Sequence, residues 1–119
     1  MVSDQAATLD RVFHALAHPA RRSMIRRLAG GEQNLSALAE PLRMTFPAAS
    51  KHVRELEQAR LVQRRVEGRQ HLCRLRAAPL RDATRWTEQF RAHWEGRFRA
   101  LDALLVELKA ESRGVAKRR

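Results

Sequence analysis

Hydrophobic residues recur at helical spacing in four stretches of the first half of the chain. Steps of three and four residues place side chains on one face of a helix, so each stretch predicts an amphipathic helix. The four stripes are Leu9, Val12, Phe13 and Leu16; then Ala20, Met24, Ile25 and Leu28; then Leu35, Leu38, Ala39 and Leu42; and then Ala49, Val53 and Leu56. The first helix is expected over residues 4–17, and the glycines at positions 30 and 31 close the second.

Capping residues mark where the third and fourth helices begin. Asn34 and Thr45 are N-cap residues, and Pro47 fits the first turn of a helix, where its missing N–H costs nothing. Pro41 ends the preceding helix. Only a few residues then separate two helices, a spacing that predicts a helix-turn-helix. Arg60 follows the last stripe, to which only its aliphatic stem could add.

After the fourth helix the pattern changes to that of two strands, residues 62–66 and residues 70–75. Gly68 lies between them and tolerates the positive φ of a tight hairpin turn. The hairpin carries many basic residues, namely Arg64, Arg65, Arg69, His71, Arg74 and Arg76. They either keep an edge hairpin soluble or form a phosphate-contacting wing, and we favour the wing because a reading helix precedes it.

One long helix is expected over residues 79–111, followed by a frayed basic tail at residues 112–119. Its length of roughly 45–50 Å exceeds what a domain this small covers. Its apolar positions are Ala83, Trp86, Phe90, Trp94, Phe98, Leu101, Leu104, Leu105 and Leu108. Such a surface favours pairing with a symmetry mate, helped by the first helix, over packing within one chain alone. Gly96 marks either a close helix approach or a kink.

The distribution of charge adds to this interpretation. The chain of 119 residues carries a net charge of +11. Residues 46–76 hold eight Lys or Arg against three Asp or Glu, so the positive excess is densest on the fourth helix and the hairpin. That concentration is typical of a protein that binds a polyanion such as DNA.

The stretch LAEPLRMTFPAASKHVRELEQARLV, followed by RRVEGRQHLCRL, resembles the ArsR family of bacterial winged-helix repressors. The run Ser50-Lys51-His52 is the most recognisable part, and the similarity covers nearly the whole chain. The resemblance implies a homodimeric repressor that binds an imperfect palindrome and is released by a signal. The expected fold is mainly α with a small β-hairpin wing, in a single domain over residues 1–111 whose reading unit is residues 34–76.

Two sets of site residues follow from this interpretation. The expected DNA contacts are Pro47, Ala48, Ser50, Lys51, His52, Arg54, Arg65, Arg69 and His71. Dimerisation through the first and last helices is expected to use Leu9, Phe13, Trp86, Phe90, Trp94, Leu101 and Leu105.

No cofactor or metal site is predicted. Family metal sensors place cysteines on the helix that opens the helix-turn-helix, and residues 35–42 contain none. Asp82, His93 and Glu95 form no convincing ligand set on the last helix. Cys73 is the only cysteine; its alternation in the second strand predicts a core-facing side chain, with a thiol sensor as the alternative.

Other classes of protein find less support. No phosphate loop or nucleophile elbow is present, so an enzyme is not expected. A lone cysteine fits the reducing cytoplasm, and no apolar run is long enough to span a membrane. The rival functions are a non-specific architectural DNA-binding protein and a protein–protein adaptor. No residue pattern identifies an inducer.

Overall fold

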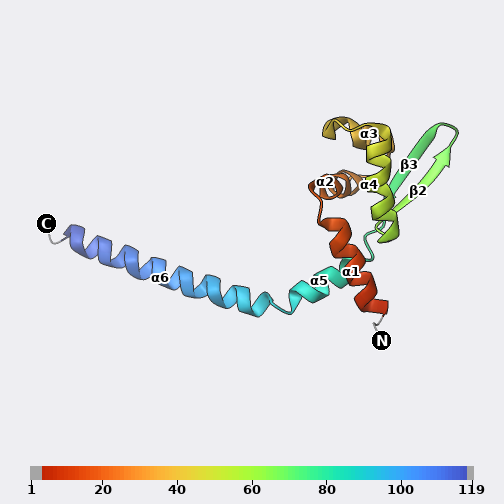
Figure 1. The fold of residues 1–119 in the computed structure, drawn as a ribbon. Helices are drawn as coiled ribbons and strands as arrows, with labels where there is room; N and C mark the ends of the chain where they lie inside the picture. The colour runs from red at the N-terminus through yellow and green to blue at the C-terminus, as the bar shows by residue number, and fades with distance from the viewer. Residues whose placement is uncertain (1–3, 118–119) are drawn as a thin grey trace. The chain divides into compact units, whose positions relative to one another are not determined.

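The computed structural model describes residues 4–117, a mainly helical chain with a small antiparallel sheet (Figure 1). In chain order the elements are α1 (Asp4–Leu16), α2 (Pro19–Leu28), β1 (Gln33–Asn34), α3 (Leu35–Ala39), the 3-10 helix η1 (Glu40–Leu42), α4 (Phe46–Gln58), β2 (Val62–Glu67), β3 (Gln70–Leu75), α5 (Leu80–Glu88) and α6 (Arg91–Lys117). They fall into two compact units, residues 1–84 and residues 85–119. The predicted fold class, mainly α with a small β-hairpin wing, is confirmed.

The core of the first unit is built from the apolar faces that the residue spacing predicted. Its largest fully buried side chains are Met24, Leu35, Leu38, Leu56, Leu61, Val12, Val53 and Cys73. Withdrawing each such apolar side chain from water stabilises the fold by about 1.5–3 kcal/mol. In α1 the burial differs from the expected stripe, because Val12 and Ala15 are completely buried whereas Phe13 remains 38% exposed.

Side-chain caps begin the helices that form the helix-turn-helix. Asn34 Oδ1 accepts a hydrogen bond from the backbone N–H of Ala37 at 2.8 Å, which starts α3. Thr45 Oγ1 accepts one from the N–H of Ala48 at 3.3 Å, which starts α4. Each cap is worth about 1 kcal/mol. Both capping predictions are confirmed.

The turn between α3 and α4 is tight. After α3 the chain passes through η1, which contains Pro41, rather than stopping at that proline. Arg43 then adopts a left-handed conformation with φ of 53°. The N–H of Met44 bonds to the carbonyl of Ala39 at 3.2 Å, which reverses the chain and brings α4 back against α3.

The sheet has three strands in the order β1-β3-β2, one more than predicted. The hairpin β2–β3 pairs Val62 with Leu75 and Glu67 with Gln70, and Gly68 at the turn has a φ of 59°. β1 has only two residues, which is too short for a pattern of hydrophobic positions to predict it. Arg60 lies past the end of α4 in a left-handed conformation, φ 60°, so it adds nothing to the helical stripe.

The expected single helix over residues 79–111 is instead two helices, α5 and α6. The interruption falls at Gln89 and Phe90, with no glycine or proline to mark it, and Gly96 lies inside α6. The backbone N–H of Phe90 donates to the carbonyl oxygen of Thr87 at 3.0 Å, a bond that reaches back three residues and forms the turn at the end of α5. The expected frayed tail is helical as far as Lys117, and positions 118–119 lie outside the described residues.

Among the described residues, no helix combines the length and the apolar character that crossing a membrane requires.

Candidate DNA interface

Helix α4 has one buried and one exposed face. Ala49, Val53 and Leu56 are completely buried in the core of the first unit. The predicted contact residues Pro47, Ala48, Lys51 and Arg54 are all exposed. Small residues near the start of the helix allow close approach to a surface, and the two cationic side chains further along carry the kind of N–H donor that phosphates and base edges accept.

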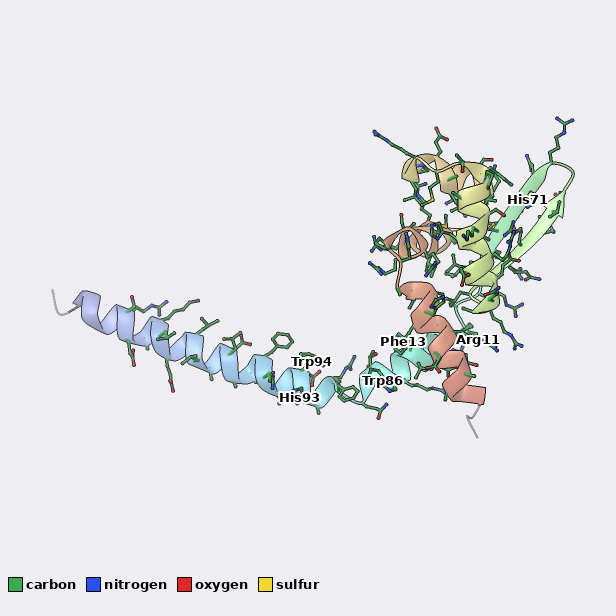
Figure 2. All side chains as sticks on the ribbon, in the orientation of Figure 1. Arg11, Phe13, His71, Trp86, His93 and Trp94 are labelled. Carbon is green, nitrogen blue, oxygen red and sulfur yellow. The ribbon has the colours of Figure 1, made fainter. Side chains whose placement is uncertain are left out.

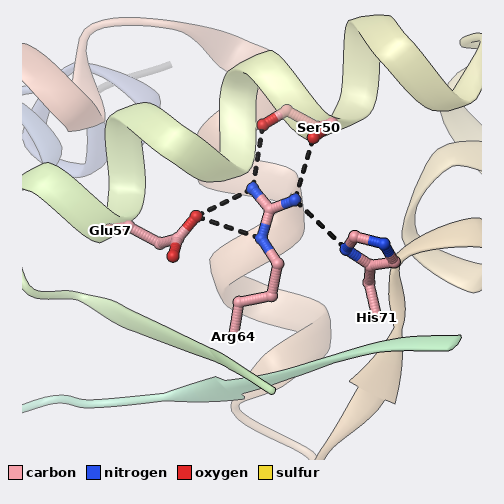
Figure 3. A network of polar contacts seen from close by, with 4 residues as sticks. All are labelled: Ser50, Glu57, Arg64 and His71. Atoms are coloured by element: carbon pink, nitrogen blue, oxygen red, sulfur yellow. Dashed lines mark hydrogen bonds and ion pairs between the residues drawn. The ribbon is translucent and has the colours of Figure 1, made fainter. Parts of the chain in front are cut away.

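Ser50 is half-buried and is held by Arg64 of the wing strand β2 (Figure 3). Arg64 Nη1 donates to Ser50 Oγ at 2.9 Å, and Nη2 donates to the Ser50 carbonyl oxygen at 3.2 Å. Nε and Nη2 of Arg64 also donate to Glu57 Oε1 at 3.1 and 2.7 Å. The hydroxyl of Ser50 accepts in this contact, so its own proton stays available for an outside acceptor.

Arg64 therefore fastens the wing to α4. Its side chain is only 11% exposed, and its positive charge is compensated by Glu57. The planar guanidinium has five N–H donors in a fixed arrangement, against three on a lysine ammonium, so it can bond Ser50 and Glu57 at the same time. Sequence reasoning counted Arg64 among the basic residues of the wing and did not assign it this role. The sequence feature that could have indicated this role is the alternation of side chains along β2, which places Arg64 on the same face as the buried Val62.

His71 is part of the same contact. This half-buried residue of β3 (Figure 2) points its Nδ1 at Arg64 Nη1, 3.4 Å away (Figure 3). The rings of His71 and Phe46 meet edge to face, with centroids 5.1 Å apart. His71 thus joins the wing to the first turn of α4, while the prediction had assigned it to DNA.

The other two predicted wing contacts differ in their surroundings. Arg65 is bonded by two carboxylates, Glu67 Oε1 at 2.9 Å and Glu32 Oε1 at 3.2 Å. A phosphate would have to compete with both. Arg69 is exposed directly after the turn glycine, Gly68, at the tip of the hairpin.

His52 lies on the flank of α4 that faces the start of α2. Its ring centroid is 4.4 Å from that of His18, whose Nδ1 caps α2 by accepting from the N–H of Ala20 at 3.1 Å. Burial is the main cause that lowers the pKa of His52, and the charges of His18, Arg21 and Lys51 lower it further against the opposing effect of Glu55. His52 is therefore mostly neutral at neutral pH.

The predicted dimer residues are distributed over both units. In α1, Leu9 is half-buried and Phe13 is exposed. The residues of the second unit are also exposed in one chain, namely Trp86, Phe90, Trp94, Leu101 and Leu105. The rings of Trp86 and Phe90 lie 5.1 Å apart across the break between α5 and α6.

Cys73 is completely buried in the core, so its predicted core-facing orientation is confirmed. Burial raises the pKa of its thiol to about 11, which suppresses the reactive thiolate. In the part of the chain that the structure describes, no group of three or more His, Cys, Asp or Glu side chains could hold a metal ion.

Comparison with curated proteins places the chain among transcriptional regulators. Residues 16–65 match a family described as a helix-turn-helix domain. A stretch of 66 residues, 56% of the chain, is 39% identical to the HTH-type transcriptional regulator Rv2034 of Mycobacterium tuberculosis, and it spans only 62% of that protein's length. A stretch of 82 residues, 69% of the chain, is 28% identical to the transcriptional repressor SdpR of Bacillus subtilis and spans 91% of it.

Solved structures give the same result. The homodimeric winged helix-turn-helix DNA-binding domain of Mb0332 from Mycobacterium bovis is 28% identical, with a TM-score of 0.58, over 80% of this chain and 93% of that one. The ArsR family transcriptional regulator RHA00566 is 30% identical, with a TM-score of 0.70, over 80% of this chain and 97% of that one. Because this likeness extends over nearly all of RHA00566, the chain belongs to the ArsR family of winged helix-turn-helix transcriptional regulators.

Proposed function

We propose that the protein is a homodimeric transcriptional repressor that reads a palindromic operator in double-stranded DNA with α4 and the β2–β3 wing. The observation that carries this proposal is the exposed face of α4, where Lys51 and Arg54 stand beside a wing that Arg64 ties to the same helix. The similarity of the chain to the transcriptional repressor SdpR and to the homodimeric domain of Mb0332 supports it.

The proposed contacts divide into two groups by their surroundings. Ser50, Lys51 and His52 form the group at or near the bases, with Pro47 and Ala48 lining the groove, and the cationic Lys51 also contacts a phosphate. Ser50 donates its hydroxyl proton to DNA while its oxygen accepts from Arg64. Arg54, Arg65 and Arg69 contact phosphates. His71 contributes mainly by fixing the wing, because Arg64 and Phe46 already hold its ring.

A twofold dimer presents two copies of α4 to successive turns of one side of the duplex. Half-sites in such complexes lie about 34–36 Å apart, which is one turn of B-DNA. We assign the dimer contact to α1 and to the C-terminal helices, through Leu9, Phe13, Trp86, Phe90, Trp94, Leu101 and Leu105.

The test is selection of bound fragments from the genome of the source organism, followed by competition of the selected site against random duplex. A site-specific repressor should prefer its operator by about 10³-fold or more. A preference below tenfold would indicate an architectural DNA-binding protein instead. Failure to bind any fragment at low salt would indicate a protein–protein adaptor.

Two substitutions distinguish contacts that read the base sequence from contacts that only hold the DNA backbone. Lys51→Ala should flatten the dependence of operator affinity on salt, because it removes a cation from the exposed face of α4. Ser50→Ala should weaken operator binding more than random-DNA binding. Arg113→Ala in α6 is the control, since it removes the same charge as Lys51→Ala from an exposed site outside the reading unit.

We infer no catalytic activity for this regulator, and assays for hydrolase or transferase activity should find none. Release from the operator requires an inducer, whose identity the operator-linked genes would suggest.

A further inference from the structure

Helix α6 carries an apolar seam with the repeat of a coiled coil. The helix has 27 residues and is therefore about 40 Å long. Trp94, Phe98, Leu101, Leu105, Leu108 and Ser112 follow one another at alternating steps of four and three. The five hydrophobic residues of this seam are between 45% and 62% exposed. Trp94, the first of them, is labelled in Figure 2. A seven-residue repeat of this kind forms the contact line between two supercoiled helices.

The residues that flank the seam determine which partner fits it. One flank carries Glu95, Asp102 and Lys109, and the other carries Arg97, Leu104 and Glu111. On each flank the sign of charge changes from one end of the helix to the other. A partner with the same sequence in the opposite direction would therefore place opposite charges beside each other.

An antiparallel copy of α6 centred on position 103 meets these requirements. In that register Glu95 faces Lys109 of the second copy, and Arg97 faces its Glu111. Symmetry repeats each attraction, which gives four favourable pairs. Leu104 meets its own counterpart, so an apolar side chain on the flank is also covered. The only unfavourable contact is between the two copies of Asp102.

The same register matches the sizes of the side chains along the seam. Trp94, the largest residue, lies opposite Ser112, the smallest. Phe98 lies opposite Leu108, and Leu101 lies opposite Leu105. Layers that alternate large and small residues pack more evenly than layers of two tryptophans or two serines.

A parallel pair is less favourable on both criteria. Each seam residue would then face its own copy, which stacks Trp94 on Trp94 and Ser112 on Ser112. The flanks would offer only the attraction between Arg97 and Asp102, repeated once by symmetry, because Leu104 would face Lys109. The parallel dipoles of the two helices would also repel.

We propose that α6 forms an antiparallel coiled coil with α6 of a second copy of this chain, in the register that places Trp94 against Ser112. The pairing deepens the homodimer assigned above and rests on that proposal. Gly96, Ala103 and Ala110 then lie on the outer face, where no close contact is required. Consistent with this, a Cβ at Gly96 would meet no atom within 4 Å in one chain.

Spin labels on the outer face test the proposal in the full-length protein. Ala103→Cys and Ala110→Cys are each prepared in a Cys73→Ala background and labelled with a nitroxide. Labels at position 103 lie at the centre of the register, whereas those at position 110 are offset by about 21 Å along the axis. Double electron–electron resonance should therefore give a clearly longer distance for position 110. Equal distances would indicate a parallel pair and overturn the proposal, as would the absence of dipolar coupling at both sites.

A charge substitution supplies a second, independent readout. Asp102→Asn should tighten self-association by about two- to fivefold, because it removes the one like-charge contact. A parallel pair would instead be weakened, since Asp102 would lose Arg97. Glu107→Gln is the matched control, because it removes the same charge from an exposed position off the seam and its flanks. Operator binding measured on the same samples distinguishes failure of this pairing from failure of the proposed repressor function.

Discussion

Replacing Arg64 by methionine would test whether the wing is fastened to α4 as the structure describes. Methionine keeps an unbranched apolar stem but removes all the donors of the guanidinium. The substitution removes four hydrogen bonds: two to Glu57 Oε1, one to Ser50 Oγ and one to the Ser50 carbonyl oxygen. The contact with His71 at 3.4 Å is lost as well.

The expected loss of stability follows from how well these groups are shielded. Breaking a fully buried ion pair costs about 3–5 kcal/mol, whereas exposed pairs contribute only about 0.2–1 kcal/mol. The Arg64 side chain is 11% exposed and that of Glu57 is 35% exposed, so the pair lies between these limits. Water can partly resolvate the abandoned carboxylate. We therefore expect Arg64→Met to lower the free energy of unfolding by about 2 kcal/mol.

Urea denaturation followed by circular dichroism would measure this loss. Arg74→Met is the matched control, because Arg74 is an exposed residue of β3 whose Nη2 bonds to Gln63 at 2.8 Å, and it should cost less than about 0.5 kcal/mol. A double-mutant cycle with Glu57→Gln should return a coupling energy of about 1–2 kcal/mol. A loss below 0.5 kcal/mol for Arg64→Met, or additivity in the cycle, would refute the reasoning.

DNA binding provides a further readout for the same variant. Arg64→Met should weaken operator affinity, because Ser50 and the wing lose their mutual position. The slope of log affinity against log salt should stay the same, since Arg64 is already neutralised by Glu57 and releases no counterion from DNA. A smaller slope would mean that Arg64 leaves Glu57 and contacts a phosphate.

Three further predictions concern single residues. The pKa of His52 in the folded protein lies below its ordinary value of 6.5, so protons bind more tightly to this residue in the unfolded state. The contribution of His52 to the free energy of unfolding is therefore complete above pH 6.5 and is lost as the pH falls through the lowered pKa. Urea titrations at pH 7.5 and 5.5 should show that the free energy of unfolding falls less in His52→Gln than in the wild-type protein. Equal losses in the two proteins would contradict this. Cys73, with a pKa of about 11, should react with a thiol reagent at pH 8 only when the protein unfolds, so rapid labelling of native protein would contradict its burial. Gly96→Ala should stabilise α6 by up to ~1 kcal/mol in thermal unfolding, and a loss of stability would reveal a contact at that position.

The helix-turn-helix was predictable because its signals are local. Asn34 and Thr45 cap the helices that they were expected to cap, and the apolar steps of α4 match the residues that the core buries. The hairpin was equally readable, since Gly68 supplies the turn between two short alternating runs. In each case the structural feature depends only on residues within a few positions of it in the sequence.

Features that depend on distant parts of the chain were not predictable in the same way. β1 becomes a strand only because β3 lies beside it, with Gln33 opposite Cys73. The break before α6 has no sequence signal, and the one glycine in that region, Gly96, drew attention to the wrong place. Arg64 was counted as a surface charge because its acceptors, Ser50 and Glu57, lie 14 and 7 residues away.

The structure changes the number of cations in the reading unit that are available to DNA from the number that the composition suggests. Two of its cations already have carboxylate partners within the protein: Arg64 is paired with Glu57, and the exposed Arg65 is paired with Glu67 and with Glu32, which lies outside the segment. If Lys51, Arg54 and Arg69 are the cations that contact phosphates, a dimer neutralises six phosphates, and the salt slope should be about −5. If Arg65 exchanges its carboxylates for a phosphate as well, the slope should approach about −7. The measured slope therefore decides whether Arg65 contacts DNA or holds the base of the wing.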